Sequence, residues 1–169
     1  MLIPVAAAVL ALFFVGRDTP GPSTNARPAE GFALTDAEAI AKFEELNELR
    51  LRALRERDPS LLSLAFTPDS PAGQRVAASI RRLTRDSVLV RTSEETEEVS
   101  LSSNDPSEIL LLQTVVVTPR FIDEQGKDVT QDPAVERWTV EWTLHRLSDR
   151  WLIHDAEIIE SEPLRKDGM

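Results

Sequence analysis

Two kinds of hydrophobic periodicity divide the chain after residue 34. Apolar residues recur every three to four positions up to about residue 85 and alternate with polar residues after it. The first run opens with TDAE at residues 35–38, which is the pattern of a helix capping box. The helical spacing predicts a helix over residues 35–57, ended by Asp58 and Pro59. Its apolar stripe consists of Ile40, Phe43, Leu46, Leu49, Ala53 and Leu54.

Two shorter helices are predicted next. Ser60 is placed to begin a helix over residues 61–66, and the proline-rich stretch 67–71 interrupts it. A third helix is expected over residues 71–85, with Pro71 in its first turn, where proline is tolerated. Val76, Ile80 and Leu83 form its apolar stripe.

After residue 86 the pattern has the period of a β-strand. We expect strands at residues 87–91 and 109–121, the second apolar on both faces like a central strand. Residues 94–98 are mostly glutamate and are interpreted as an acidic connection. Residues 137–147 and 150–160 predict a hairpin that turns at residues 148–149.

The alternation within this hairpin predicts its faces. Trp138, Val140, Trp142 and Leu144 fall on one face. With a two-residue turn, Trp151, Ile153, Asp155, Glu157 and Ile159 join them. Both histidines, His145 and His154, fall on the other face near Glu141. All three tryptophans lie in this hairpin, so it is the expected centre of the core.

The N-terminal residues form a separate region. Residues 1–16 carry no charged side chain, and residues 2–15 would span about 21 Å as a helix, short of the roughly 30 Å hydrocarbon core. The length fits a signal segment or a marginal anchor, with a buried core helix as the alternative. No basic residue precedes it and no clear cleavage site follows, which a start codon set too far downstream would explain.

Residues 17–33 are rich in Pro and Gly and indicate a flexible linker. The expected organisation is therefore a membrane segment at 1–16, this linker, a folded domain at 34–162 and a polar tail at 163–169. The favoured location is the cell membrane, contacted through residues 2–16, with the domain outside the cytoplasm. Secretion is the alternative.

Composition removes several classes of function. The chain contains no cysteine, which excludes disulfides, thiolate ligands and cysteine nucleophiles. The net charge of -10 argues against a nucleic-acid partner, because phosphate binding relies on clustered Lys and Arg. Arginines on the first and third predicted helices could instead meet anionic lipid headgroups, or pair with the many carboxylates. They are Arg50, Arg52, Arg55, Arg57, Arg81, Arg82 and Arg85.

The order of elements, helices first and then a sheet ending in a long hairpin, resembles the nuclear transport factor 2-like superfamily, including its SnoaL-like members. The resemblance covers about residues 35–160. It rests on LRLRAL at residues 49–54, FTPDSP at 66–71, WTV with LHR between 138 and 146, and RWLIHD at 150–155. The pattern looks like exported or membrane-anchored domains of actinobacteria and is similar in outline to mycobacterial-cell-entry-associated membrane proteins. It implies an α+β fold in which helices pack on a curved, cone-like antiparallel sheet.

The same resemblance implies where a catalytic group would lie. Enzymes with this fold place an Asp or His in the apolar pocket of the cone, where its proton affinity is tuned. Asp155 and Glu157 are the candidate catalytic residues, because the predicted faces put them beside the tryptophans. The candidate ligand pocket is formed by Trp138, Trp142, Trp151 and Asp155. The alternative is that the two carboxylates lie at the open end of the sheet, or pair with an arginine on a helix.

The sequence gives little support for a metal site. His145, His154 and Glu141 are too few to predict a zinc site, and residues 93–98 and 102–105 match no calcium loop. We expect no metal and no cofactor. The leading hypothesis is a module without catalytic activity that binds a partner protein, or a second copy of itself, through the exposed sheet. The alternative is a small-ligand carrier or an isomerase-like or cyclase-like enzyme with a pocket near Trp142 and Asp155.

Overall fold

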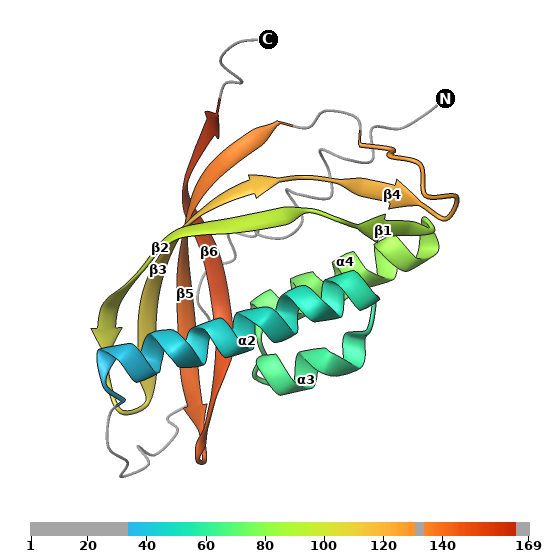
Figure 1. The fold of residues 1–169 in the computed structure, drawn as a ribbon. Coiled ribbons are helices and arrows are strands. Elements are labelled where there is room, and N and C mark those ends of the chain that lie inside the picture. The colour runs from blue at the N-terminus through green and yellow to red at the C-terminus, as the bar shows by residue number, and fades with distance from the viewer. Residues whose placement is uncertain (1–33, 131–133, 165–169) are drawn as a thin grey trace.

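The computed structural model describes residues 34–130 and 134–164. Within them, three α-helices pack against a curved antiparallel sheet, as predicted (Figure 1). The helices are α2 (Asp36–Glu56), α3 (Leu62–Ala65) and α4 (Pro71–Arg85), with a 3₁₀ turn at Pro59–Leu61. No helix in the described ranges is both long and apolar enough to cross a membrane. The predicted membrane segment 1–16 and linker 17–33 lie outside those ranges.

The helix boundaries follow from local chemistry. Thr35 and Glu38 form the predicted capping box at the start of α2, and each side chain bonds the other residue's backbone N–H. The helix ends at Arg57, which adopts the left-handed conformation with φ of 54°. Ser70 caps α4 by accepting a bond from the backbone N–H of Gly73, and Pro71 follows in the first turn.

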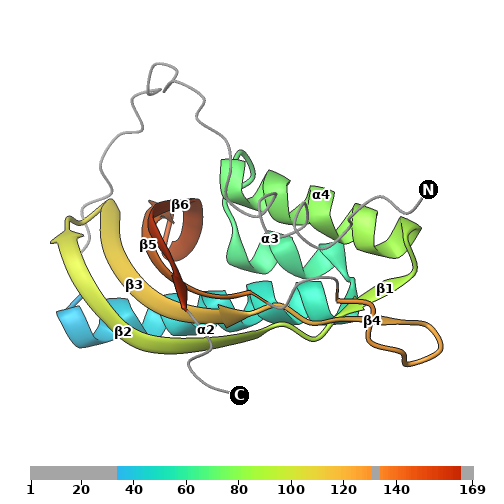
Figure 2. The ribbon, with the colours of Figure 1, turned by 90° about the horizontal axis from the view of Figure 1, so that it is seen from above.

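The main sheet contains β2 (Ser93–Asn104), β3 (Glu108–Thr118), β5 (Val135–Leu147) and β6 (Arg150–Leu164), in that spatial order. Strands β1 (Val88–Val90) and β4 (Phe121–Asp123) form a separate antiparallel pair. The strands curve around α2, while α3 and α4 lie beside β6 (Figure 2). The concave face is the one that contacts the helices and contains the core.

Most predicted strands are confirmed, with three differences. The region predicted as an acidic connection, residues 94–98, belongs to β2, so that prediction was wrong. An edge strand needs backbone pairing on one side alone, and β3 supplies it while the carboxylates stay in water. The predicted strand 109–121 ends at Thr118, and Phe121 begins β4. Strand β6 continues to Leu164, two residues beyond the predicted domain end.

The hairpin β5–β6 turns at residues 148–149 as predicted, with Leu147 opposite Arg150. The tryptophans, Val140, Leu144 and Ile153 are buried, also as predicted, whereas Ile159, predicted on the same face, is exposed. Two β-bulges interrupt the ladder, however, because His154 and Ile159 have no opposite residue on β5. The faces of the four residues between the bulges are therefore inverted relative to the sequence prediction.

Candidate functional site

Side chains fill the interior of the cone around Trp142. Trp142 is 1% exposed, its ring lies 5.2 Å from that of Phe43, and its indole N–H donates to Gln113 Oε1 at 3.0 Å. Gln113 is equally buried and donates from Nε2 to Thr96 Oγ1 at 2.8 Å. The polar atoms of this region are thus paired within the protein, as buried polar groups require.

A buried ion pair lies beside this tryptophan. Arg50 is 3% exposed, and its Nη2 donates to Glu94 Oε2 at 2.5 Å. Its Nε donates to Asn47 Oδ1 at 2.8 Å, and its guanidinium carbon lies 5.4 Å from the centre of the Trp142 ring. For Arg50 the sequence left open a lipid-facing basic patch or a pairing with a carboxylate, and the structure shows the pairing. Its partner is 44 residues away, so no local signal reveals the pair.

Next to this pair, a pocket of about 300 Å³ opens between α2, β1 and the ends of β2, β3 and β5. Its volume is at the lower limit for small-molecule sites. Trp138 supplies its largest apolar side chain and donates from Nε1 to Glu136 Oε2 at 2.6 Å. The apolar lining is Leu51, Leu54, Val90, Val117 and Trp138, and the polar lining is Glu48, Arg55, Thr92, Ser93 and Glu94.

The predicted site residues do not form a common pocket. Of the four pocket candidates, Trp138 lines this cavity, whereas Trp142 and Trp151 are buried in the core. The bulge at His154 places Asp155 opposite Thr143 and Glu157 opposite Glu141, both on the convex face away from Trp142. The predicted face of Asp155 and Glu157 was therefore wrong, since alternation holds only along an unbroken ladder.

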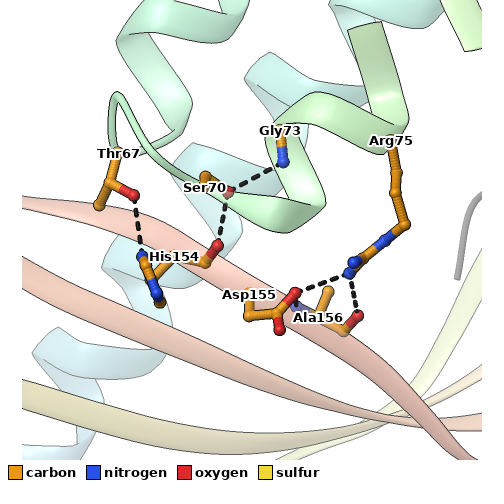
Figure 3. Close-up of polar contacts among 7 residues, drawn as sticks. All are labelled: Thr67, Ser70, Gly73, Arg75, His154, Asp155 and Ala156. Carbon is orange, nitrogen blue, oxygen red and sulfur yellow. Dashed lines mark hydrogen bonds and ion pairs between the residues drawn. The ribbon is translucent and has the colours of Figure 1, made fainter. Parts of the chain in front are cut away.

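Asp155 instead pairs with a helix arginine, the alternative that the sequence left open. Arg75 of α4 donates from Nη2 to Asp155 Oδ1 at 2.6 Å and to the carbonyl of Ala156 at 2.8 Å (Figure 3). The Asp155 side chain is 41% exposed. Glu157 is exposed and has no ion-pair partner among the described residues. Neither carboxylate lies in an apolar enclosure of the kind that would tune it as a base.

The two histidines lie side by side, a contact that the sequence did not predict. Their rings are stacked with centroids 4.0 Å apart and planes tilted by 13°. His145 Nε2 lies 3.1 Å from Glu108 Oε2, and His154 Nδ1 is hydrogen-bonded to Thr67 Oγ1 at 3.0 Å. Burial, and then the neighbouring His145, lowers the pKa of His154. Within the described residues no group of three or more His, Asp or Glu side chains could hold a metal ion.

The convex face of the sheet bears an aliphatic row on β3 and several carboxylates on β2, β5 and β6. Leu110, Leu112 and Val116 of β3 point outward and are half-buried. Their neighbours on β2 and β5 are mixed, since Val116 lies between Glu95 and Arg137, and Leu112 between Ser100 and Glu141. Glu141 lies directly opposite Glu157 across β5 and β6. Five of these carboxylates form no ion pair within the described residues: Glu95, Glu98, Glu141, Glu157 and Glu160.

The fold and these features define a class: a cone-like α+β domain with a filled interior, a small pocket at one end and an acidic outer sheet. No protein-family model matches the sequence, and no curated protein matches it. Solved structures do match. A protein from Caulobacter vibrioides described as having a cystatin-like fold has a TM-score of 0.51 at 14% identity, covering 77% of this chain and 92% of that one.

Two further solved structures that match are an enzyme and a region of a chloroplast protein. The hexachlorocyclohexane dehydrochlorinase LinA-type3 from Novosphingobium barchaimii has a TM-score of 0.53 at 9% identity, with 79% of this chain and 94% of the enzyme covered. The intermembrane space region of the chloroplast protein ARC6 has a TM-score of 0.56 at 11% identity, with 74% and 96% covered. The chain therefore has the nuclear transport factor 2-like, or cystatin-like, fold. At these identities the likeness establishes the fold and leaves the activity open.

Proposed function

We propose that this protein is an interaction module without catalytic activity that binds a partner protein through the convex face of its sheet. In this proposal residues 2–16 hold the chain at a membrane, with the folded domain outside the cytoplasm. The partner surface carries basic side chains around an aliphatic centre. The observation that carries the proposal is the outward-facing aliphatic row of β3, on the same face as five carboxylates of β2, β5 and β6 that form no ion pair within the described residues.

The charge arrangement supports a partner rather than solubility alone. Like charges directly opposite each other on neighbouring strands destabilise a sheet, and Glu141 and Glu157 have this relation. Lys or Arg from another protein would remove the repulsion and steer the encounter. A second copy docking through the same face would bring carboxylates against carboxylates, so this proposal favours a different protein over a homodimer.

The chemistry of the interior supports a role without catalysis. The carboxylate of Glu94 is neutralised by Arg50, and that of Asp155 by Arg75. A general base must be within reach of a substrate and free to accept its proton. Glu94 and Asp155 are each held by an arginine, and Glu157 is exposed on the convex face, outside any apolar enclosure.

Photo-crosslinking in intact cells of the source organism tests the proposal. A photoreactive residue replaces Leu112, and the matched control replaces Gln74, an exposed residue of α4. We expect an adduct with one other protein from position 112 and none from position 74. The double variant Glu141→Lys, Glu157→Lys should abolish that adduct while leaving the thermal transition in place. No adduct at position 112, or an adduct with a second copy alone, would contradict the proposal.

A second candidate function is binding of a small, largely apolar ligand in the pocket beside Trp138. Its support is the cavity of about 300 Å³ with apolar walls and a polar edge. Titration with a library of small aromatic and aliphatic compounds, followed by NMR, should shift the Trp138 indole and the methyl groups of Val90 and Val117. Val117→Phe fills the space and should remove the response. This function would be contradicted if no compound in the library gave a response that Val117→Phe removes.

A further inference from the structure

A second cavity lies outside the cone. It is a groove of about 670 Å³ between α3, the start of α4 and the tip of the β5–β6 hairpin. One wall consists of residues 66–70, the segment that joins α3 to α4, which we call the strap. Phe66, Thr67, Pro68 and Ser70 of the strap line the groove. The shape of this groove therefore depends on where the strap is held.

The strap is attached to the outer edge of β6 at two consecutive residues. Phe66 forms a parallel bridge with Ile153, and the Thr67 backbone N–H donates to the Ile153 carbonyl at 2.9 Å. The Ser70 hydroxyl donates to the His154 carbonyl at 2.5 Å. The Thr67 hydroxyl is hydrogen-bonded to the His154 ring at 3.0 Å (Figure 3). Two of these contacts belong to a single histidine.

His154 has this role because it is the extra residue of a β-bulge. It lies between Ile153, which is opposite Leu144, and Asp155, which is opposite Thr143, and has no partner on β5. A bulge re-aims the side chain and frees the backbone of the inserted residue. The bulge thus lets His154 contact the strap and stack on His145 at 4.0 Å.

The charged groups around the pair come from each neighbouring element. Glu108 of β3 lies 3.1 Å from His145 Nε2. Asp69 of the strap lies 3.9 Å from His154 Nδ1, slightly beyond the Thr67 hydroxyl. Asp155 of β6 is engaged by Arg75 of α4. His154 therefore has two alternative partners on the strap, a neutral hydroxyl and a carboxylate.

We propose that the stacked pair His145–His154 is a pH-sensitive latch that sets the position of the strap and hence the shape of the groove. With both rings neutral, they remain stacked and His154 bonds Thr67. When both rings are protonated, the two positive charges repel each other, and the repulsion opposes stacking at this distance. The His154 ring then leaves His145 and exchanges Thr67 for the carboxylate of Asp69, which moves the strap. The lowered pKa of His154 agrees with this order, since the ring resists protonation beside His145.

NMR on the full-length chain in a nonionic detergent, between pH 7.5 and 4.5, tests the latch. We expect the His154 ring to take up its proton within this range, with a pKa below that of an ordinary histidine. The backbone amides of Thr67 and Ser70 should shift at the same pH as the His154 ring. The Trp142 indole signal should stay constant, because its partner Gln113 does not titrate.

Three variants separate the latch from general acid sensitivity. His154→Phe keeps a ring in the stack and should abolish the strap response. Thr67→Val removes the hydroxyl and keeps the side-chain shape, and it should uncouple the strap from the histidine titration even if His154→Phe does not fold. His145→Phe removes the second charge from the stack and should also abolish the strap response. The proposal is overturned if the strap amides do not respond in the parent chain, or respond equally in Thr67→Val.

Discussion

Replacing Glu94 with glutamine leaves the buried guanidinium of Arg50 without its counter-charge. Breaking one side of a buried ion pair costs about 3–5 kcal/mol. The lower end applies here, because the Glu94 side chain is 17% exposed and a glutamine oxygen can still accept one bond from Arg50. A domain of this size loses about 4 °C in Tm per kcal/mol. We therefore expect Glu94→Gln to lower the Tm by about 12 °C, measured by circular dichroism.

A matched control exists on the same strand. Glu97 also pairs with an arginine, Arg137, through bonds of 2.9 and 3.1 Å, but both side chains are 39% exposed. Solvent screens this pair, so Glu97→Gln should lower the Tm by less than about 3 °C. The double variant Arg50→Met, Glu94→Gln removes both buried charges and should melt above Glu94→Gln alone. Equal losses for Glu94→Gln and Glu97→Gln would refute the assignment of Arg50 as a buried charge.

Three further outcomes are expected. Gly73→Ala should destabilise the fold, because a Cβ there would lie 3.0 Å from the Cβ of Phe66. Overpacking of this kind costs about 1–3 kcal/mol, which urea denaturation measures as a lower free energy of unfolding. Arg57→Gly should raise the urea midpoint by relieving the left-handed conformation at φ of 54°, a gain of about 0.5–1 kcal/mol. His154 has a lowered pKa in the folded state, so the unfolded chain binds the proton first. The neutral His154 ring therefore stabilises the fold fully above about pH 6.5, and this contribution is lost as the pH falls below that value. In urea denaturation curves recorded over a series of pH values, His154→Phe should remove this pH dependence of the free energy of unfolding.

Elements whose signals are local could be predicted from the sequence. The capping box at Thr35 and Glu38 and the stripe behind it predicted α2, and the alternation of Trp138, Val140, Trp142 and Leu144 predicted the buried face of β5. These patterns depend on residues within a few positions of one another, where the periods of helix and strand act directly. Net charge and the absence of cysteine likewise restricted chemistry before any fold was known.

The candidate sites depended on contacts between distant residues. The bulge at His154 is a property of two paired strands, and it moved Asp155 and Glu157 from the expected pocket to the convex face. The sequence of an amphipathic helix does not show whether one of its arginines is exposed or paired in the interior. The partner of Arg50 lies 44 residues further along the chain.

The sequence by itself determined the α+β class, the helices, the hairpin and the acidic character of this protein. Hydrophobic periodicity and composition depend on residues close together along the chain, so no tertiary contact is needed to recognise them. Only the tertiary structure decided that the cone is filled around Trp142, that the pocket lies at Trp138, and that His145 and His154 stack beside the strap. Those results depend on strand register and long-range pairing, in which a single inserted residue inverts a face.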